Sequence, residues 1–314
     1  MIPARLSLVL VALAGLAGPQ VPAPDEIQDR EAFRISVSVD LVVLHATVRD
    51  REGLFVSDLP KEHFQVYEDG IRQTIRLFRH EDIPVTVGLV VDHSGSMREK
   101  MADVITAART FVQSSNPEDE MFVVNFNEKV SLGLPGAIPF TNASDDLQRA
   151  ILNAPLSGQT ALYYAVGEGL ERLRAGSRDK RVLVVISDGG DNASKLRLDE
   201  VLKMAERSSA LVYTIGIFDS GDPDRNPGVL RRLARATGGE AFIPGEASSL
   251  AAVCERIARD IRHQYTIGYV SSNPVRPGAY RAIRVVAAPM DSGKLSVRSR
   301  AGYIADGEPG SPAR

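Results

Sequence analysis

The chain of 314 residues holds a single cysteine and five histidines. One cysteine cannot close an internal disulfide, so no such framework staples this chain. Cys254 follows the helical spacing of apolar residues at Leu250, Val253, Ile257 and Ile261, and we expect it to fill a core. The histidines show neither the spacing of metal ligands nor a pairing with the cysteine. This scatter argues against catalysis by either residue type.

Concentrated charge of one sign is also missing. The net charge is -3 and no cluster of Lys or Arg stands out, which argues against a nucleic-acid partner. The chain also lacks a glycine-rich phosphate loop with lysine, and no general base stands beside the candidate site described below. We therefore expect a binding protein and not an enzyme. Otherwise the composition, 44% hydrophobic and 25% charged, is ordinary for about two globular domains.

The longest apolar run, Leu6 to Ala17, follows Arg5 and is too short to span a bilayer. Its layout is typical of a secretory signal, so we predict a signal peptide at residues 1–23. A buried amino-terminal helix is the alternative, which the prolines at 19, 22 and 24 disfavour. Cleavage after about 17 to 23 residues would give an exported protein without a membrane span in the mature chain. Its location would be the periplasm, the cell surface or the medium. Residues 24–32 are a polar linker.

Two stretches with the period of β-strands flank the middle of the chain. In residues 33–82, apolar residues alternate from Ile35 and continue through Leu41 to Val48, and Glu68-Asp69-Gly70 marks a hairpin turn. Residues 265–304 contain three more strand patterns, at 265–270, 280–287 and 295–303. Each stretch is small for an independent core. We predict one all-β domain made from both, with the middle of the chain inserted, and two separate small sheets as the alternative. Residues 305–314 are a polar, disordered tail.

Residues 83–264 alternate between apolar strands and amphipathic helices. Strand patterns occur at 85–91, 121–126, 182–187, 211–217 and 241–243. Helical patterns occur at 101–112, 147–152, 161–173, 198–208, 230–236 and 250–262. This alternation predicts an α/β domain with a doubly wound, mostly parallel, Rossmann-like sheet and helices on both faces.

Polar residues follow three of these strands or precede the next helix. Asp92, Ser94 and Ser96 follow the first strand, Thr160 precedes a helix, and Asp188 closes another strand. Ligands gather at the carboxyl ends of strands in an open parallel sheet, so these loops can meet at one point. Their oxygen donors suit Mg²⁺ or Ca²⁺. Helix capping would explain the aspartates alone, but it would not require the threonine.

The order Asp92-x-Ser94-x-Ser96, Thr160, Asp188 resembles the metal-ion-dependent adhesion site (MIDAS) of von Willebrand factor A (VWFA) domains. The resemblance implies that the three hydroxyls are direct ligands, while the two aspartates act largely through bound waters. It covers roughly residues 83 to 265. The flanking segments VYEDG (66–70) and YTIGY (265–269) look similar to the bacterial VWFA-related acidobacterial domain family.

The resemblance also implies a function. Mg²⁺ would be the bound ion, with Ca²⁺ or Mn²⁺ as alternatives, and the few direct protein charges would leave it electrophilic. A protein partner would then supply an exposed Asp or Glu carboxylate as the last ligand, as in adhesion. Two other readings stay open: a Mg²⁺-dependent hydrolase, and an envelope scaffold in which the metal only stabilises the fold.

Four further residues lie near the predicted site. Asp191 and Asn192 either orient Asp188 or its waters, or only form the turn. We expect the His93 side chain to point to solvent and not to bind metal. Tyr164 stands where many members of the family carry aspartate, so one supporting contact of the site differs here.

Overall fold

The computed structural model describes residues 41–218, 225–273, 278–288 and 294–305. The predicted signal peptide, the linker, the strand pattern at 35–39 and the polar tail lie outside these ranges. Among the described residues, no helix is both long and apolar enough to cross a membrane.

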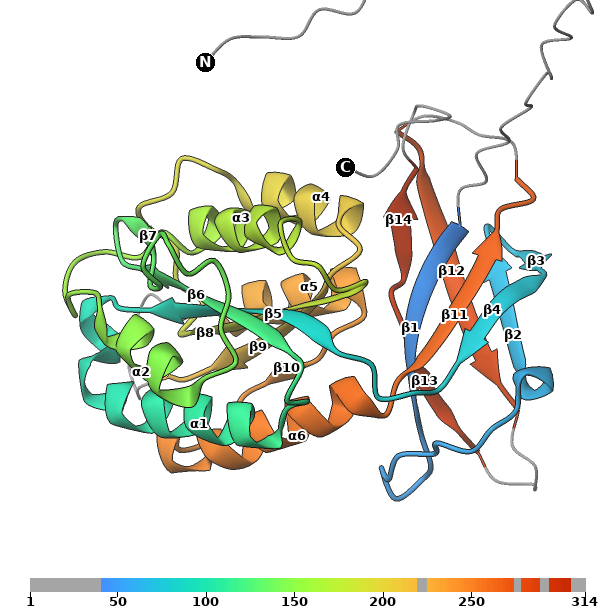
Figure 1. The fold of residues 1–314 in the computed structure, drawn as a ribbon. Coiled ribbons are helices and arrows are strands. Elements are labelled where there is room, and N and C mark those ends of the chain that lie inside the picture. Colours follow the sequence, from blue (N-terminus) through green and yellow to red (C-terminus); the bar gives the residue numbers. More distant parts are fainter. Residues whose placement is uncertain (1–40, 219–224, 274–277, 289–293, 306–314) are drawn as a thin grey trace, which may run out of the picture. The chain divides into compact units, whose positions relative to one another are not determined.

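A six-stranded sheet forms the centre of the part of the chain that contains the helices (Figure 1). Its order is β10 (Ala241–Phe242), β9 (Leu211–Gly216), β8 (Lys180–Ser187), β5 (Val85–Asp92), β6 (Glu120–Phe126) and β7 (Val130–Leu132). All neighbouring pairs are parallel except β6 and β7. Every residue of β5 is buried, as its unbroken apolar run predicts for a central parallel strand. The predicted mostly parallel sheet is therefore confirmed.

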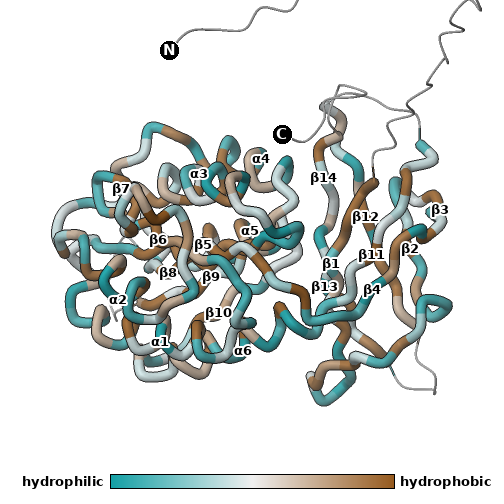
Figure 2. The backbone as a smooth tube through the Cα atoms, in the orientation of Figure 1, coloured by the Kyte–Doolittle hydropathy of each residue, from teal (hydrophilic) through white to brown (hydrophobic). Residues whose placement is uncertain are grey.

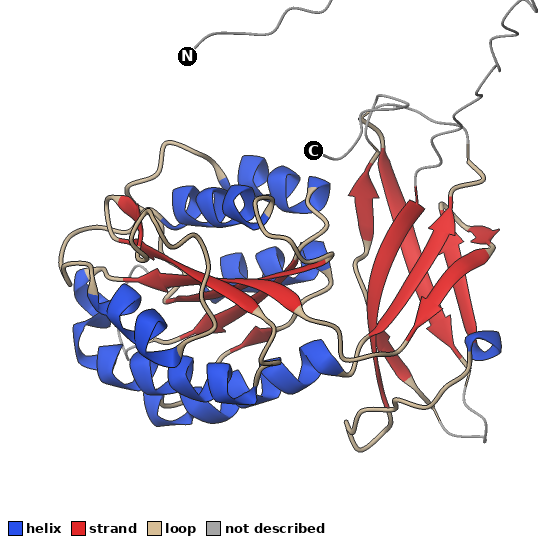
Figure 3. Cartoon of the chain, in the orientation of Figure 1, coloured by secondary structure: helices blue, strands red, loops and turns tan. Residues whose placement is uncertain are grey.

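Helices cover both faces of this sheet (Figures 1 and 3). One face carries α1 (Met101–Ser114), α2 (Ser144–Leu152) and α6 (Leu250–Arg262). The other carries α3 (Leu162–Leu173), α4 (Leu198–Arg207) and α5 (Pro227–Thr237). Hydrophobic residues concentrate along the strands between these layers (Figure 2). Cys254 belongs to this core, and burial raises the pKa of its thiol to about 12, so its expected role as a core residue is confirmed.

Two four-stranded sheets combine strands from both ends of the described chain. The first has the order β13 (Ser296–Arg298), β1 (Leu41–Arg49), β11 (Tyr265–Val270) and β4 (Ile75–Arg79). The second has the order β14 (Gly302–Ile304), β12 (Tyr280–Ala287), β2 (Phe64–Glu68) and β3 (Ile71–Gln73). Short 3-10 helices lie at Lys61–His63 (η1), Gly95–Lys100 (η2) and Ala247–Ser249 (η3). The predicted all-β architecture built from the two flanking segments is confirmed, while the domain boundaries stay predictions.

One predicted strand is wrong. The pattern at 295–303 gives two strands, because β13 pairs with β1 in the first sheet and β14 pairs with β12 in the second. The chain leaves one sheet and enters the other between Arg298 and Gly302. Period-two alternation does not reveal such a crossing, since both strands keep the same period.

The two flanking motifs meet at Glu68, a buried carboxylate. Its oxygens accept hydrogen bonds from the hydroxyls of Tyr269 (2.7 Å) and Ser271 (2.5 Å) and from the side-chain amide of Asn273 (2.8 Å). These donors replace the water that a buried carboxylate loses. The motif around Glu68 thus connects the amino-terminal and carboxyl-terminal strands.

Candidate metal site

The site lies where β5 and β8 end side by side. Val91 pairs with Ile186, so Asp92 at the end of β5 lies beside Ser187 at the end of β8. Asp188 follows directly. Parallel pairing in this register brings together two loops that are far apart in the sequence.

Asp92 is fully buried, at 0% exposure, and both of its carboxylate oxygens are held. Oδ1 accepts the backbone N–H of Ser94 at 2.8 Å, and Oδ2 accepts the hydroxyl of Ser187 at 2.6 Å. Burial raises the pKa of Asp92 to about 6; the hydrogen bonds from Ser187 and Ser94 oppose this shift, and the charge of Asp188 adds to it. A cation nearby would stabilise the ionised carboxylate.

The two serines and Asp188 are in direct contact. The hydroxyl oxygens of Ser94 and Ser96 lie 3.1 Å apart, and Ser96 donates to Asp188 Oδ2 at 2.6 Å. The other oxygen of Asp188 accepts the backbone N–H of Gly190 at 3.1 Å. Three hydroxyl or carboxylate groups therefore converge from the β5 and β8 loops.

Thr160 completes the group from the loop before α3. A cavity of about 190 Å³ is lined by Ser94, Gly95, Ser96, Gly158, Gln159, Thr160, Asp188 and Asn192. Asp92 does not line it; this residue lies behind, held to the backbone of Ser94. The structure thus places four of the five predicted site residues on one small cavity and the fifth beneath it.

Asn192 positions Thr160. Its side-chain oxygen accepts the backbone N–H of Thr160 at 2.8 Å, and its own N–H donates to the carbonyl of Thr160 at 3.0 Å. Asp191 accepts the N–H of Tyr163 at 2.8 Å, at the start of α3, and that of Ser194 at 3.1 Å. These contacts orient the threonine loop and the helix start. That Asp191 and Asn192 also orient Asp188 or its waters stays a prediction.

The expectation that His93 points to solvent is wrong, since its side chain is 1% exposed. Asn125 donates its amide to the carbonyl of Ala150 at 2.7 Å, so its oxygen is left to accept from His93 Nε2 at 3.1 Å. Burial lowers the pKa of His93 to about 4, so the ring is neutral. The histidine anchors the β5 loop to β6 and does not contribute to the surface around the site.

Two further residues that hold the site loops, Ser187 and Glu128, were not predicted. Ser187 was taken only as the end of a strand, and its position before Asp188 was the one available signal. Glu128 accepts the backbone N–H of Gln159 at 3.1 Å. Gly158 has φ of +88°, and a Cβ there would lie 1.6 Å from the Glu128 carboxylate. The positive φ therefore favours glycine at this point of the cavity wall, whereas the exposed Glu128 side chain could move away from a methyl group.

The donor set fits a hard divalent cation. All side-chain donors at the cavity are oxygens, and buried Asp92 lies near a second carboxylate, Asp188. Within the described ranges, no three or more His, Cys, Asp or Glu residues group closely enough to hold a metal. Three of the five groups at this site are hydroxyls, so the site does not depend on such a group of residues. The remaining difference from the family pattern, Tyr164, is 40% exposed and donates its N–H to Ser194.

Comparison with known proteins gives a consistent result. The family model described as "von Willebrand factor type A domain" matches residues 86–255. A curated relative, inter-alpha-trypsin inhibitor heavy chain H2 of Mesocricetus auratus, is 26% identical over 173 residues, which are 51% of this chain and 18% of that protein. The chain thus corresponds to a minor part of this relative.

Solved structures share the fold. A von Willebrand factor type A protein from Catenulispora acidiphila has a TM-score of 0.51 and 14% identity, covering 87% of this chain and 75% of the other. Proximal thread matrix protein 1 from the mussel byssus, solved with zinc in its MIDAS motif, has a TM-score of 0.46 and 17% identity. It covers 58% of this chain and 49% of the other. At these identities the likeness concerns the fold alone.

Proposed function

Because this chain belongs to the von Willebrand factor type A domain family, we propose that it is an exported protein that binds a protein partner through a divalent cation. Asp92, Ser94, Ser96, Thr160 and Asp188 would hold the ion. The partner would contribute an Asp or Glu carboxylate.

The observation that carries this proposal is the convergence of Ser94, Ser96, Thr160 and Asp188 on one cavity, with buried Asp92 behind them. None of the residues lining the cavity is cationic. Two carboxylates with little access to solvent need a compensating positive charge. Mg²⁺ suits this site best, because it is usually bound by few charged protein groups and keeps several waters.

The chemistry of the lining also supports an acidic ligand. The three hydroxyls carry no formal charge and Asp188 is the one anion in the lining, so part of the charge of a bound divalent ion would remain for a further carboxylate. When bound, that ion would supply a positive centre at which a carboxylate from another protein replaces water. The side chains of the chain itself hold the ion and orient the loops; no step of a reaction is required of them.

The surrounding loops would give the contact its specificity, because a single carboxylate contact is modest. The rim near Thr160 is made rigid by Asn192 and by Glu128, which holds Gln159. Exposed Tyr164 lies nearby on α3, and tyrosine is enriched in protein interfaces. We propose that this rim, and not a flexible loop, presents the ion to the partner.

Thermal unfolding tests the metal site. If the ion binds only the folded protein, metal at about 100 times its Kd should stabilise it by roughly 2.7 kcal/mol. Mg²⁺, Ca²⁺ and Mn²⁺ would each be compared with chelator. The Thr160→Ala variant should lose most of this response, while Thr106→Ala, which removes an exposed hydroxyl on α1, should retain it. Identical melting of the wild type with and without every metal would disprove the site.

A pull-down from the native envelope tests the partner. Chelator should release the partner, and replacing its acidic ligand residue by the amide should prevent binding. Stabilisation by metal without any metal-dependent partner would instead indicate a scaffold. Turnover of phosphate esters with Mg²⁺ would indicate a hydrolase. Amino-terminal sequencing of the exported protein tests the signal peptide, since Met1 should be absent.

A further inference from the structure

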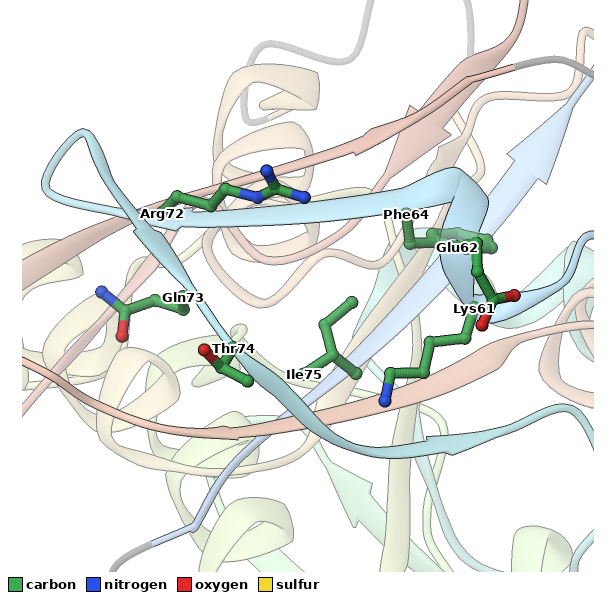
Figure 4. Close-up of a pocket in the computed structure, with 7 residues that line it drawn as sticks. All are labelled: Lys61, Glu62, Phe64, Arg72, Gln73, Thr74 and Ile75. Atoms are coloured by element: carbon green, nitrogen blue, oxygen red, sulfur yellow. The ribbon is translucent and has the colours of Figure 1, made fainter.

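A second cavity lies in the all-β part of the chain and shares no lining residue with the cavity of the metal site. It measures about 450 Å³ and is lined by Lys61, Glu62, Phe64, Arg72, Gln73, Thr74 and Ile75 (Figure 4). It forms where the chain passes through Thr74 from β3 in one sheet to β4 in the other. This crossing leaves an opening at the edge of the two sheets.

Two strand edges at this opening lack a partner strand among the described residues. β3 pairs with β2 only at Val66, Tyr67 and Glu68, so Phe64 and Gln65 have no neighbour on that side. β4 ends the order of its sheet and pairs only with β11. Unpaired N–H and C=O groups along such an edge form a template for one more strand.

The inner part of the cavity is apolar. Phe64 is 3% exposed and Ile75 is 8% exposed, and both belong to the core between the two sheets. Figure 4 shows Ile75 projecting into the space between the strands, with Lys61 at one end. An apolar side chain entering here would extend an existing core without disturbing it.

The rim is basic. Lys61 and Arg72 line the cavity, and Arg76 and Arg79 lie on β4; all four are exposed. Within the described ranges their side chains form no ion pair, hydrogen bond or ring contact. Glu62 is the one acidic residue of the lining. The lining thus holds two cations and one anion, and β4 adds two exposed cations along its edge, a balance that favours a negatively charged ligand.

Charges and bulges on an edge strand also guard against aggregation, and β4 has both. Its pairing with β11 shifts between Gly268 and Tyr269, which leaves Arg76 without a partner residue. A second copy of the chain would bring the same four cations against this edge, and like charges directly opposite one another destabilise a strand pair. The edge therefore disfavours pairing with the same edge of a second copy, and an acidic strand is the favoured ligand.

We propose that this edge, defined by β4 and the cavity beside it, docks an extended acidic segment of a protein partner as an added strand. Backbone hydrogen bonds to β4 supply affinity. Alternate side chains of the segment point to opposite faces, so one apolar side chain fills the cavity over Phe64 and Ile75 while carboxylates meet Lys61 and the arginines. This interaction needs neither the metal nor Asp188.

The test uses the full chain and a fluorescein-labelled peptide of about eight alternating Glu and Val residues, the length of a typical strand. Fluorescence anisotropy should show saturable binding below about 1 mM. Binding should weaken about tenfold or more for Arg72→Glu and stay unchanged for Arg231→Glu, an equal charge reversal on exposed α5. The peptide with an N-methyl group on every residue should not bind, because neither of its edges can then donate backbone hydrogen bonds to β4. Binding should persist in chelator, which separates this edge from the metal site.

Hydrogen exchange of the β4 amides identifies what covers the edge. Protection that appears only with the acidic peptide supports the proposal. Protection already present without peptide would mean that another part of this chain occupies the edge. Protection that rises with protein concentration would mean a second copy. Either result, failure to saturate, or equal binding of an alternating Lys and Val peptide would overturn the proposal.

Discussion

Replacing Asp92 by asparagine should have opposite effects on the metal-free and the metal-loaded protein. In the metal-free protein, ionised Asp92 is fully buried beside Asp188. Asparagine keeps the size of the side chain and an oxygen that can accept from Ser94, but removes the charge. We therefore expect the metal-free variant to be more stable than the wild type, and the metal-loaded variant to be less stable.

The size of the effect follows from the pKa. Burial raises the pKa of Asp92 from 3.8 to about 6, and each pKa unit corresponds to about 1.4 kcal/mol. At pH 7.5 the ionised form therefore costs about 3 kcal/mol of folding free energy. Asparagine would also disturb the hydrogen bond from Ser187, and this loss should offset about 1 kcal/mol of the stabilisation gained by removing the charge. The net gain of the metal-free variant should be about 2 kcal/mol.

The dependence of stability on pH gives the sign of this difference between variant and wild type independently. A carboxyl whose pKa is raised on folding contributes stability that is fully present below its unfolded pKa of 3.8 and is lost as pH rises through about 6. Wild type and Asp92→Asn should therefore differ little at pH 4 and most at pH 7.5 in chelator. Saturating Mg²⁺ should reverse their order, because only the wild type binds it.

Urea unfolding followed by circular dichroism measures these free energies, with chelator and with Mg²⁺. Asp103→Asn, at an acid on α1 outside the site, controls for net charge. The reasoning fails if metal-free Asp92→Asn is clearly less stable than the wild type at pH 7.5. It also fails if Mg²⁺ stabilises the variant as much as the wild type.

Three further outcomes are expected. Burial lowers the pKa of Lys180 to about 8 from 10.5, so Lys180→Met should be the more stable form below pH 8, by up to about 3 kcal/mol. This advantage should vanish as pH rises towards 10.5 in denaturant titrations. Gly158→Ala should cost at least about 1 kcal/mol and weaken metal-dependent stabilisation, because φ of +88° strains a residue with a Cβ and the methyl group would displace the Glu128 side chain that holds Gln159; adding Glu128→Ala should recover little of the loss. Tyr269→Phe removes a donor to buried Glu68 and should cost about 1 to 3 kcal/mol in urea, with the metal response unchanged.

The sequence predicted the central sheet well because its signals are local. A buried parallel strand such as Val85–Asp92 is an unbroken apolar run, and the polar residues that end it sit at a fixed place relative to the sheet. Four of the five predicted site residues came together for the same reason, since parallel pairing brings the carboxyl ends of β5 and β8 to one edge. The fifth, Thr160, comes from the loop before α3 and is held there by Asn192.

The features that were missed depend on contacts between distant residues. His93 is buried because Asn125, on the neighbouring strand, accepts from its ring. Asn192 lies next to Asp191 in sequence but holds Thr160. The crossing between sheets after Arg298 follows from partners chosen at β1 and β12. The periodicity of apolar residues along a segment does not indicate which strand that segment will pair with.

The pairing of Arg79 with Thr266 has a consequence for the order of folding. β4 and β11 are antiparallel neighbours, so the whole inserted α/β domain occupies the position of a hairpin loop between them. In an unfolded chain, closing so long a loop is costly, by about 0.6 kcal/mol for each doubling of its length. Once the inserted domain has folded, both of its ends belong to one folded unit. Only the short peptides around 80–84 and 263–264 then remain to be ordered. The α/β domain should therefore fold first and act as the nucleus from which the two sheets assemble. In pulsed hydrogen exchange during refolding, its β5 and β8 amides should gain protection before those of β4 and β11.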